Sequence, residues 1–405
     1  MVKENTMKQT EIGLLPEEWD VKKLGEVISY ISYGFTNPMP TTNVGIWMVT
    51  ANDVKNGKIN FKTARKTSIE AFNKYLTEKS KPKQNDLLLT KDGTLGRLAV
   101  VGNEVICINQ SVAVIKTNKY INVFFLKHLL QDNFYQKVMI ENAGGSTIKH
   151  IYITVVDKMP IIVPPLPEQE AIAEALSDAD AWIGSLEQLI AKKRLIKQGA
   201  MQELLTLKED WEVKKLGEVV HVYRGGSPRP IQDFITDKSD GINWIKIGDT
   251  SSSGKYIVST NEKITPDGEK NSRRVYPGDF LLSNSMSFGR PYILKIDGCI
   301  HDGWLVLQNY KAYFDTEFLY YLLTSKYVTD QYKSKAAGSG VLNLNKEVVS
   351  TVELIIPSLT EQTCIATILS DMDAELEALE GQLGKAKQIK QGMMQELLTG
   401  RVRLV

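Results

Sequence analysis

The sequence predicts an α/β (α+β) fold: two mixed α/β domains separated by two long antiparallel helices that form a coiled coil, with an internal pseudo-two-fold repeat. The first observation is a duplication. Residues 19–27 (WDVKKLGEV) return as residues 211–219 (WEVKKLGEV), and residues 196–206 (IKQGAMQELLT) return as residues 389–399 (IKQGMMQELLT). Because the offsets are 192 and 193 residues, the chain is one unit written twice, with matching ends (the frame) around two divergent inserts.

The second observation is the spacing of apolar residues in the frame. In each copy the apolar residues step 4-3-4-3-4, which is the seam of a coiled coil. Prolines stand just before this run, and proline is tolerated in a first helical turn. The pattern predicts a helix over residues 167–205, about 58 Å long. The seam comprises Ile172, Leu176, Ala179, Ile183, Leu186 and Ile190 in the first copy and Ile365, Leu369, Met372, Leu376, Leu379 and Leu383 in the second.

The inserts predict mixed α/β structure. Strands are expected at residues 86–90, 98–101 and 279–282, and short helices at 120–130 and 314–323. Frame and inserts together predict four consecutive segments. These are residues 1–163 (arm and first domain), 164–207 (central helix), 208–356 (second domain) and 357–405 (C-terminal helix).

Composition indicates an ordinary globular protein, with 42% hydrophobic and 24% charged residues. Three cysteines lack metal-ligand spacing, and no stretch approaches 18 apolar residues. We therefore expect a soluble, cytoplasmic protein without a membrane partner. The net charge of +1 hides a segregation, because residues 55–83 hold nine basic residues whereas residues 168–187 and 361–380 hold six acids each and no Lys or Arg. Basic domains on acidic helices are one interpretation, and solvated surfaces of no special function are the other.

Motifs for catalysis are missing. The four histidines are scattered and give no ligand cluster. Residues 248–255 (GDTSSSGK) resemble a phosphate-binding loop, but the spacing between the glycines is one residue too long and Tyr256 stands where Ser or Thr is needed. The sequence therefore predicts a binding protein, with no metal or cofactor of its own.

The frame resembles type I restriction–modification specificity (S) subunits. The resemblance rests on residues 10–27 (TEIGLLPEEWDVKKLGEV), the PPLPEQ opening of the first long helix, the MQELLT ends and LLTGRVRLV at the end, and it spans the chain. It implies that each insert is a target-recognition domain for one half of a split DNA site, and that the paired helices hold the domains apart and dock two methyltransferase (M) subunits. It also implies restriction (R) subunits, and that S-adenosylmethionine, ATP and Mg²⁺ are used by these partners while the specificity subunit catalyses nothing.

Given this resemblance, we expect double-stranded DNA to contact polar loops of the inserts, because Arg, Asn and Ser reach base edges while Lys and small residues suit phosphates. Arg97 and Arg290 occupy equivalent positions, so they are expected to serve phosphate binding or the fold. An ordinary surface turn is the alternative for every position. The expected DNA-binding residues are Lys91, Thr94, Arg97, Ser146, Thr147, Lys149, Ser283, Asn284, Ser287, Arg290, Ser339 and Asn343.

The repeated helix ends are the expected subunit interface. Methionines and leucines beside a helix glycine suit a docking surface, and a glycine inside a helix costs about 1 kcal/mol. Completion of the intramolecular coiled coil and a slack helix end are the alternatives. The interface residues are Gly199, Met201, Leu204 and Leu205, with Gly392, Met394, Leu397 and Leu398 in the second copy. A two-headed coiled-coil scaffold that binds proteins rather than DNA remains the alternative function.

Overall fold

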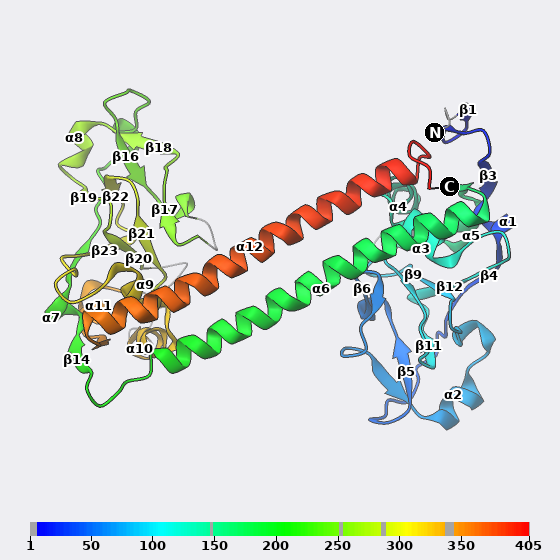
Figure 1. The fold of residues 1–405 in the computed structure, drawn as a ribbon, viewed down its shortest axis with the longest axis horizontal. Coiled ribbons are helices and arrows are strands. Elements are labelled where there is room, and N and C mark those ends of the chain that lie inside the picture. Colours follow the sequence, from blue (N-terminus) through cyan, green and yellow to red (C-terminus); the bar gives the residue numbers. More distant parts are fainter. Residues whose placement is uncertain (1–5, 146–148, 251–253, 285–288, 337–343, 405) are drawn as a thin grey trace. The chain divides into compact units, whose positions relative to one another are not determined.

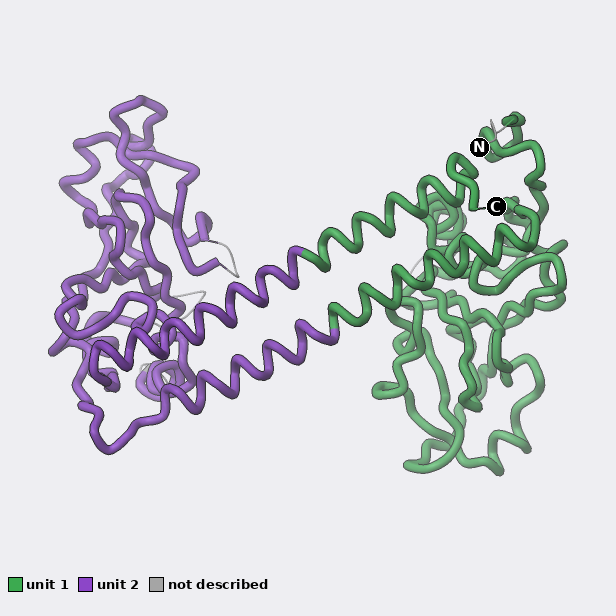
Figure 2. Tube along the Cα trace, viewed as in Figure 1, with its two compact units in different colours: residues 1–187, 382–405 green, residues 188–381 purple. Residues whose placement is uncertain are grey.

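The computed structural model describes residues 6–145, 149–250, 254–284, 289–336 and 344–404. The chain forms two compact units, Met1–Glu187 with Gln382–Val405 and Gln188–Gly381 (Figure 2). The boundary between the units falls inside both long helices, so each unit contains one insert and part of each helix.

The first insert consists of small sheets and short helices (Figure 1). Its sheets have the strand orders β10-β9-β12-β4, β11-β5-β8 and β13-β3, with hairpins β1-β2 and β6-β7. The elements are β1 (Met7–Thr10), β2 (Gly13–Pro16), β3 (Asp20–Lys23), α1 (Leu24–Val27), β4 (Ile28–Tyr33), β5 (Ile46–Val49), β6 (Val54–Lys55), β7 (Lys58–Ile59), β8 (Arg65–Thr67), α2 (Ile69–Tyr75), β9 (Leu87–Thr90), β10 (Leu98–Val100), β11 (Ile106–Ile108), β12 (Val112–Thr117), α3 (Val123–Gln131), α4 (Asn133–Glu141), α5 (Ile153–Lys158) and β13 (Pro160–Val163).

The second insert keeps the shared strand order of these sheets and adds β17 and β19 at sheet edges, with sheets β15-β23-β20-β21-β17, β18-β16-β22-β19 and β14-β24. The predicted strands and helices are confirmed in both inserts. The elements are β14 (Glu212–Lys215), α7 (Leu216–Val219), β15 (His221–Arg224), β16 (Ile242–Ile245), β17 (Tyr256–Ile257), β18 (Glu262–Ile264), α8 (Pro266–Glu269), β19 (Arg273–Val275), β20 (Phe280–Ser283), β21 (Pro291–Leu294), β22 (Gly298–Ile300), β23 (Trp304–Gln308), α9 (Thr316–Thr324), α10 (Lys326–Ala336), α11 (Lys346–Ser350) and β24 (Glu353–Ile356).

Strands β9 and β20 are covered on both faces, which explains their continuous apolar sequences. Leu87 and Leu89 contribute to the core that includes the helices, whereas Leu88 points into a separate core between the sheets. In the second unit Phe280 and Leu281 divide in the same way. Each insert is therefore a layered α/β domain with two cores.

The long helices are α6 (Leu166–Leu204) and α12 (Leu359–Leu397), each 39 residues and shifted by 193. They run antiparallel within each unit. In the first unit Lys387 Nζ lies 2.8 Å from Glu187 Oε1 and Lys390 Nζ lies 2.5 Å from Asp180 Oδ1, so one helix rises in number as the other falls. In the second unit Lys193 pairs with Glu375 at 2.6 Å. The predicted coiled-coil pair is thus confirmed.

The seam prediction also holds, with one refinement. All twelve seam residues are buried or half-buried. However, Ile172 and Leu176 pack into the core of the first insert, and Ile365 and Leu369 pack into that of the second. The first residues of each seam therefore pack against the domain at the start of the helix, and the later residues lie between the two helices.

A buried glutamine anchors each domain to the start of its helix. Gln169 is fully buried; its Oε1 accepts the Asn122 N–H at 2.8 Å, and its Nε2 donates to the carbonyls of Tyr120 and Pro164 at 3.0 and 2.8 Å. Its counterpart Gln362 makes the equivalent three bonds, to the Asp315 N–H and the carbonyls of Tyr313 and Pro357, at 2.8, 2.9 and 3.0 Å.

The neighbouring glutamate anchors the tryptophan of the other frame motif. Trp19 Nε1 donates to the fully buried Glu168 at 2.8 Å, and Arg403 Nη2 donates to the same carboxylate at 2.8 Å. In the second unit Trp211 Nε1 and Lys208 Nζ donate to Glu361 at 3.0 and 2.6 Å. The tryptophan motif and the start of the long helix are therefore both repeated in the sequence, because in each copy they bind each other.

Replacing the anchor glutamine should destabilise its own unit. Gln169→Ala and Gln362→Ala each leave one backbone N–H and two carbonyls without their partner, which should cost about 2–4 kcal/mol of unfolding free energy. Urea unfolding followed by tryptophan fluorescence measures the change. The matched control is Gln188→Ala, at an exposed position of α6, which should change stability by less than about 0.5 kcal/mol. Equal stability of all three variants would contradict the anchor.

Candidate nucleic-acid interface and docking surface

In the first unit the two loops expected to contact DNA lie together. Asp92 and His150 form a β-bridge, and Asp92 Oδ1 lies 2.7 Å from His150 Nδ1 and 2.8 Å from Lys91 Nζ. The Ile151 N–H donates to the Lys91 carbonyl at 2.9 Å. Exposed Lys149 therefore stands on a segment tied directly to Lys91. Ser146 and Thr147 lie outside the described residues.

The turn after Lys91 has a structural role as well. Its glycines Gly93 and Gly96 have φ values of 75° and 77°, a conformation that favours glycine. The Thr94 carbonyl accepts the Thr90 hydroxyl. The Arg97 guanidinium donates to the Val54 carbonyl at 3.2 Å. Arg97 thus braces hairpin β6-β7, which agrees with the expected role in the fold.

In the second unit the N–H of Leu344 donates to the Asn284 carbonyl at 3.0 Å. Ser283 is fully buried and Asn284 is 7% exposed, with its Nδ2 donating to the Asp302 carbonyl at 3.0 Å. Ser283 is the last residue of β20, which continues one residue past the predicted strand, and Asn284 follows it directly, so both side chains are covered. Arg290 donates to the Gly254 carbonyl at 3.3 Å. Ser287, Ser339 and Asn343 lie outside the described residues.

Sequence reasoning missed the aromatic residues that accompany the basic segment of the first insert. The ring of Tyr33, which is 38% exposed at the edge strand β4, is covered by the ammonium groups of Lys79 and Lys91 at 5.5 and 5.4 Å. Lys66 lies 4.0 Å from the Trp47 ring. In the second insert Arg273 lies 5.0 Å from the Tyr223 ring. Cations beside exposed rings suit both phosphates and bases.

The repeated helix ends serve the cores more than expected. Leu205, Leu397 and Leu398 are 4%, 4% and 6% exposed, and pack inside the cores of their units. Met201, Leu204 and Met394 are partly buried against the same cores. These side chains therefore have intramolecular partners, which lie in the domain cores and not only in the coiled coil of the alternative interpretation.

Other residues of the repeat remain open to solvent. A Cβ atom on Gly199 or Gly392 would meet nothing within 4 Å. Ile196 and its counterpart Ile389 are 46% and 43% exposed. In the second unit the end of α6 and α10 border an open groove of about 800 Å³. Its lining includes Gln198, Met201, Gln202, Leu205, Lys326 and Tyr327.

In the described part of the chain no three His, Cys, Asp or Glu side chains are grouped to hold a metal ion. A search of the same residues finds no helix with the length and apolarity needed to cross a membrane. His301 is half-buried beside Trp244 and Trp304, and this partial burial lowers its pKa.

Comparison with known proteins identifies both halves of the chain. The model of the type I restriction modification DNA specificity domain matches residues 16–193 and again residues 208–390. Two similar curated proteins come from Methanocaldococcus jannaschii. The putative type I restriction enzyme MjaX specificity subunit is 24% identical, covering 99% of this chain and 98% of its own length. The MjaVIII specificity subunit is 26% identical, covering 99% and 97%.

Solved structures share the fold. The S subunit of a type I restriction–modification system from M. genitalium aligns with a TM-score of 0.60 at 16% identity, covering 94% of this chain and 96% of that one. A chain from a study of complex assembly and conformational transition of a type I system aligns at 0.58 and 18% identity, covering 96% and 99%. With two matched domains spanning most of its length, this chain belongs to the type I restriction–modification specificity subunits, and its two inserts are target-recognition domains.

Proposed function

We propose that this chain supplies the DNA specificity of a type I restriction–modification complex. Each target-recognition domain contacts one half of a bipartite double-stranded DNA target. The long helices dock two methyltransferase subunits, which the restriction subunits join. The chain itself is non-catalytic. S-adenosylmethionine, ATP and Mg²⁺ act in the partner subunits, which modify adenine and cleave DNA.

The observation that carries this proposal is the contrast between frame and inserts. The inserts share the central strand order of their sheets but present different side chains, as expected of two readers of different sequences. The helix ends instead repeat residues that packing does not explain. Ile196 and Ile389, for example, are identical and exposed. Identical exposed residues at two places suit one kind of partner bound twice.

The recognition domains carry suitable chemistry for DNA. Lys91, Lys149 and the Tyr33 ring with Lys79 gather cationic and aromatic groups on the first domain. Lysines of this kind neutralise phosphates and make affinity salt-dependent. Half-sites read from one side of the duplex must lie about 34 Å or a multiple apart, which requires two readers at fixed separation. Helices of 39 residues, about 58 Å each, are longer than one such repeat.

A protein-binding scaffold is the competing function, and DNA affinity separates the two. For DNA binding the logarithm of the affinity falls linearly with the logarithm of the salt concentration, because phosphate contacts release counterions. Protein-binding domains need not show that slope. Binding of the methyltransferase complex to DNA without sequence preference would favour the scaffold.

Lysine substitutions on the first domain should weaken DNA binding uniformly across sequences. In the methyltransferase complex, Lys79→Ala with Lys149→Ala should lower the salt slope by about 0.9 for each phosphate that is no longer neutralised. Lys192→Ala, an exposed lysine on α6, is the matched control and should leave the slope unchanged. Titrations of labelled DNA at several salt concentrations give the slopes. Identical slopes for all complexes would remove these residues from the interface.

Exchange of one domain should change one half-site alone. Replacing residues 21–163 by the matching segment of a relative replaces nearly all of the β3-β13 pair together and leaves Trp19 and Glu168 in place. Methylation mapping should then show one new and one unchanged half-site. Exchange of residues 213–356 should alter the other half. A map in which one exchange changes both half-sites would rule out independent domains.

Charges on the exposed isoleucines should block docking without unfolding the chain. Ile196→Asp with Ile389→Asp should abolish the complex with methyltransferase subunits, and either single variant should retain one subunit instead of two. The control Leu195→Asp alters a more exposed residue, 69% exposed, whose counterpart is Gln388 and which is therefore not part of the repeat. Native mass spectrometry of co-expressed complexes measures the stoichiometry. A double variant that still assembles two-to-one would place the interface elsewhere.

A further inference from the structure

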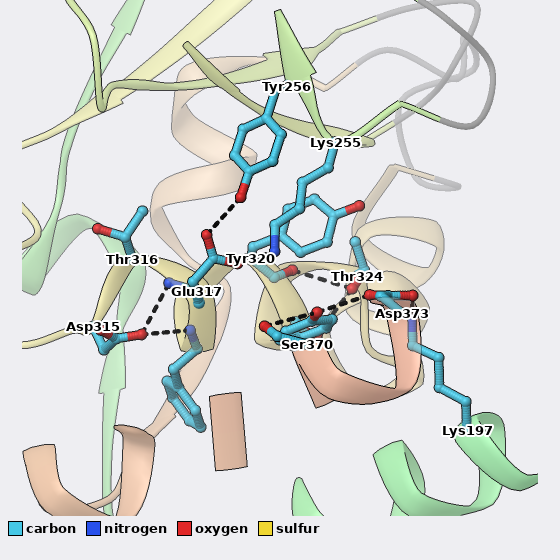
Figure 3. A network of polar contacts seen from close by, with 12 residues as sticks. Lys197, Lys255, Tyr256, Asp315, Thr316, Glu317, Tyr320, Thr324, Ser370 and Asp373 are labelled. Atoms are coloured by element: carbon cyan, nitrogen blue, oxygen red, sulfur yellow. Dashed lines mark hydrogen bonds and ion pairs between the residues drawn. The ribbon is translucent and has the colours of Figure 1, made fainter. Parts of the chain in front are cut away.

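A single carboxylate in the second unit joins three elements (Figure 3). Asp373, on α12, accepts the Tyr321 hydroxyl of the domain helix α9 at 2.7 Å, and it also pairs with Lys197 of α6. The same hydroxyl lies 3.2 Å from Ser370 Oγ. Asp373 therefore links the recognition domain to α12 and α12 to α6 at one point.

The first unit builds the same joint with the helices exchanged. Asp180, on α6, lies 2.5 Å from Lys390 of α12 and 3.3 Å from Lys127 of the domain helix α3. His128 lies 3.1 Å from Ser177 Oγ. Three pairs stand 193 residues apart, namely Asp180 and Asp373, Ser177 and Ser370, and Lys197 and Lys390. The joint is thus a repeated feature. The domain contributes Lys127 and His128 to it in the first copy and Tyr321 in the second.

The lysines of both joints are largely covered, whereas the carboxylates of Asp180 and Asp373 are 29% and 41% exposed. The side chains of Lys127, Lys390 and Lys197 are 11%, 16% and 20% exposed. Burial acts to raise the pKa of Asp180, but the hydrogen bond and charge of Lys390, with Lys127, outweigh it and lower that pKa. Burial also lowers the pKa of His128 to about 3, so its contact with Ser177 is that of a neutral ring.

A second set of contacts connects Lys255 and Tyr256 of the second domain with α9, which carries the Tyr321 of the Asp373 joint. Lys255 pairs with Glu317, and its ammonium group lies 4.4 and 4.7 Å from the rings of Tyr320 and Tyr321. Tyr256 donates its hydroxyl to Glu317 at 2.8 Å. Burial lowers the pKa of Lys255 to about 8. Figure 3 shows these side chains converging from the sheet, α9 and the long helices.

Each joint is the second of two fixed points between domain and helix. The first is the anchor glutamine, Gln169 or Gln362, which stands 11 residues before Asp180 or Asp373 on the same helix. Eleven residues separate the points by about 16 Å. The contacts between them are apolar, such as those of Ile172 and Leu176, and apolar packing is not directional. One anchor permits rotation about itself, whereas two anchors fix the angle.

The angle between each domain and the long helices matters for a protein that contacts two DNA half-sites a fixed distance apart. For an atom about 20 Å from the anchor, a rotation of about 10° gives a shift of about 3.4 Å, the rise of one base pair. We propose that Asp180 and Asp373 are positioning residues that fix the angle of each domain on the helix pair and so determine which spacer between the half-sites is accepted. This inference rests on the proposed function.

The test is methylation of DNA in which both half-sites are constant and the spacer varies by single base pairs. With the wild-type complex we expect one accepted spacer. Asp373→Ala and Asp180→Ala should each reduce the rate ratio between the accepted spacer and its one-base-pair neighbours by about tenfold, with the half-sites unchanged. Asp371→Ala and Asp178→Ala, exposed carboxylates two residues away on the same helices, are the matched controls and should keep the wild-type ratio.

Tyr321→Phe isolates the domain link without a cavity or a charge change. It removes only the hydroxyl from Asp373 and leaves the Lys197 pair in place, so it should relax the spacer preference of a folded complex. Asp373→Asn retains an acceptor for this hydroxyl and should restore most of the selectivity lost in Asp373→Ala. A uniform loss of activity with the spacer ratio unchanged in Tyr321→Phe would make the joint merely structural and overturn the inference. A wild-type complex indifferent to a bipartite site would instead overturn the proposed function, and this inference with it.

Discussion

The buried side-chain amide at the start of each long helix is the constraint on which the architecture depends. Gln169 and Gln362 each satisfy three backbone groups of the adjoining segments, and so join domain to helix where neither could bury those groups alone. Apolar packing of the seam then follows from the position that these bonds impose. The short PEQ and TEQ sequences are therefore the junctions of the molecule, which explains why they persist in both copies while the inserts differ.

Periodicity and repetition predicted the fold well because both are local signals. The helix expected over residues 167–205 spans Leu166–Leu204, and the strands and short helices of the inserts lie where alternation and apolar runs placed them. Strands β9 and β20 were recognisable as strands, but a run such as LLLT looks the same whichever neighbours cover it. It therefore could not be predicted from the sequence that β20 ends at Ser283 and that this residue is buried.

Partners far apart in the sequence are the part that could not be predicted. The repeated apolar residues Leu397 and Leu398 were recognisable as an interaction surface. The sequence did not indicate that they pack against the core of the first domain. Nothing local connects Arg403 with Glu168, 235 residues away, or Lys390 with Asp180. In the first unit the segments of Lys91 and Lys149, both expected to contact DNA, do lie together. Which atoms they present depends on neighbours such as Val54 and Asp302, which carry no motif.

The placement of the final segment has a consequence for synthesis. The second unit is continuous, residues 188–381, and contains all its own partners by the time the ribosome has passed them. The first unit is not. The carboxylate of Glu168 lacks its cation until Arg403 has been made, and Leu397 and Leu398 are made equally late. The domain translated first is thus the last to be completed, so a nascent chain exposes an unfinished first core throughout most of its translation, and damage at the C-terminal end is felt in the N-terminal domain.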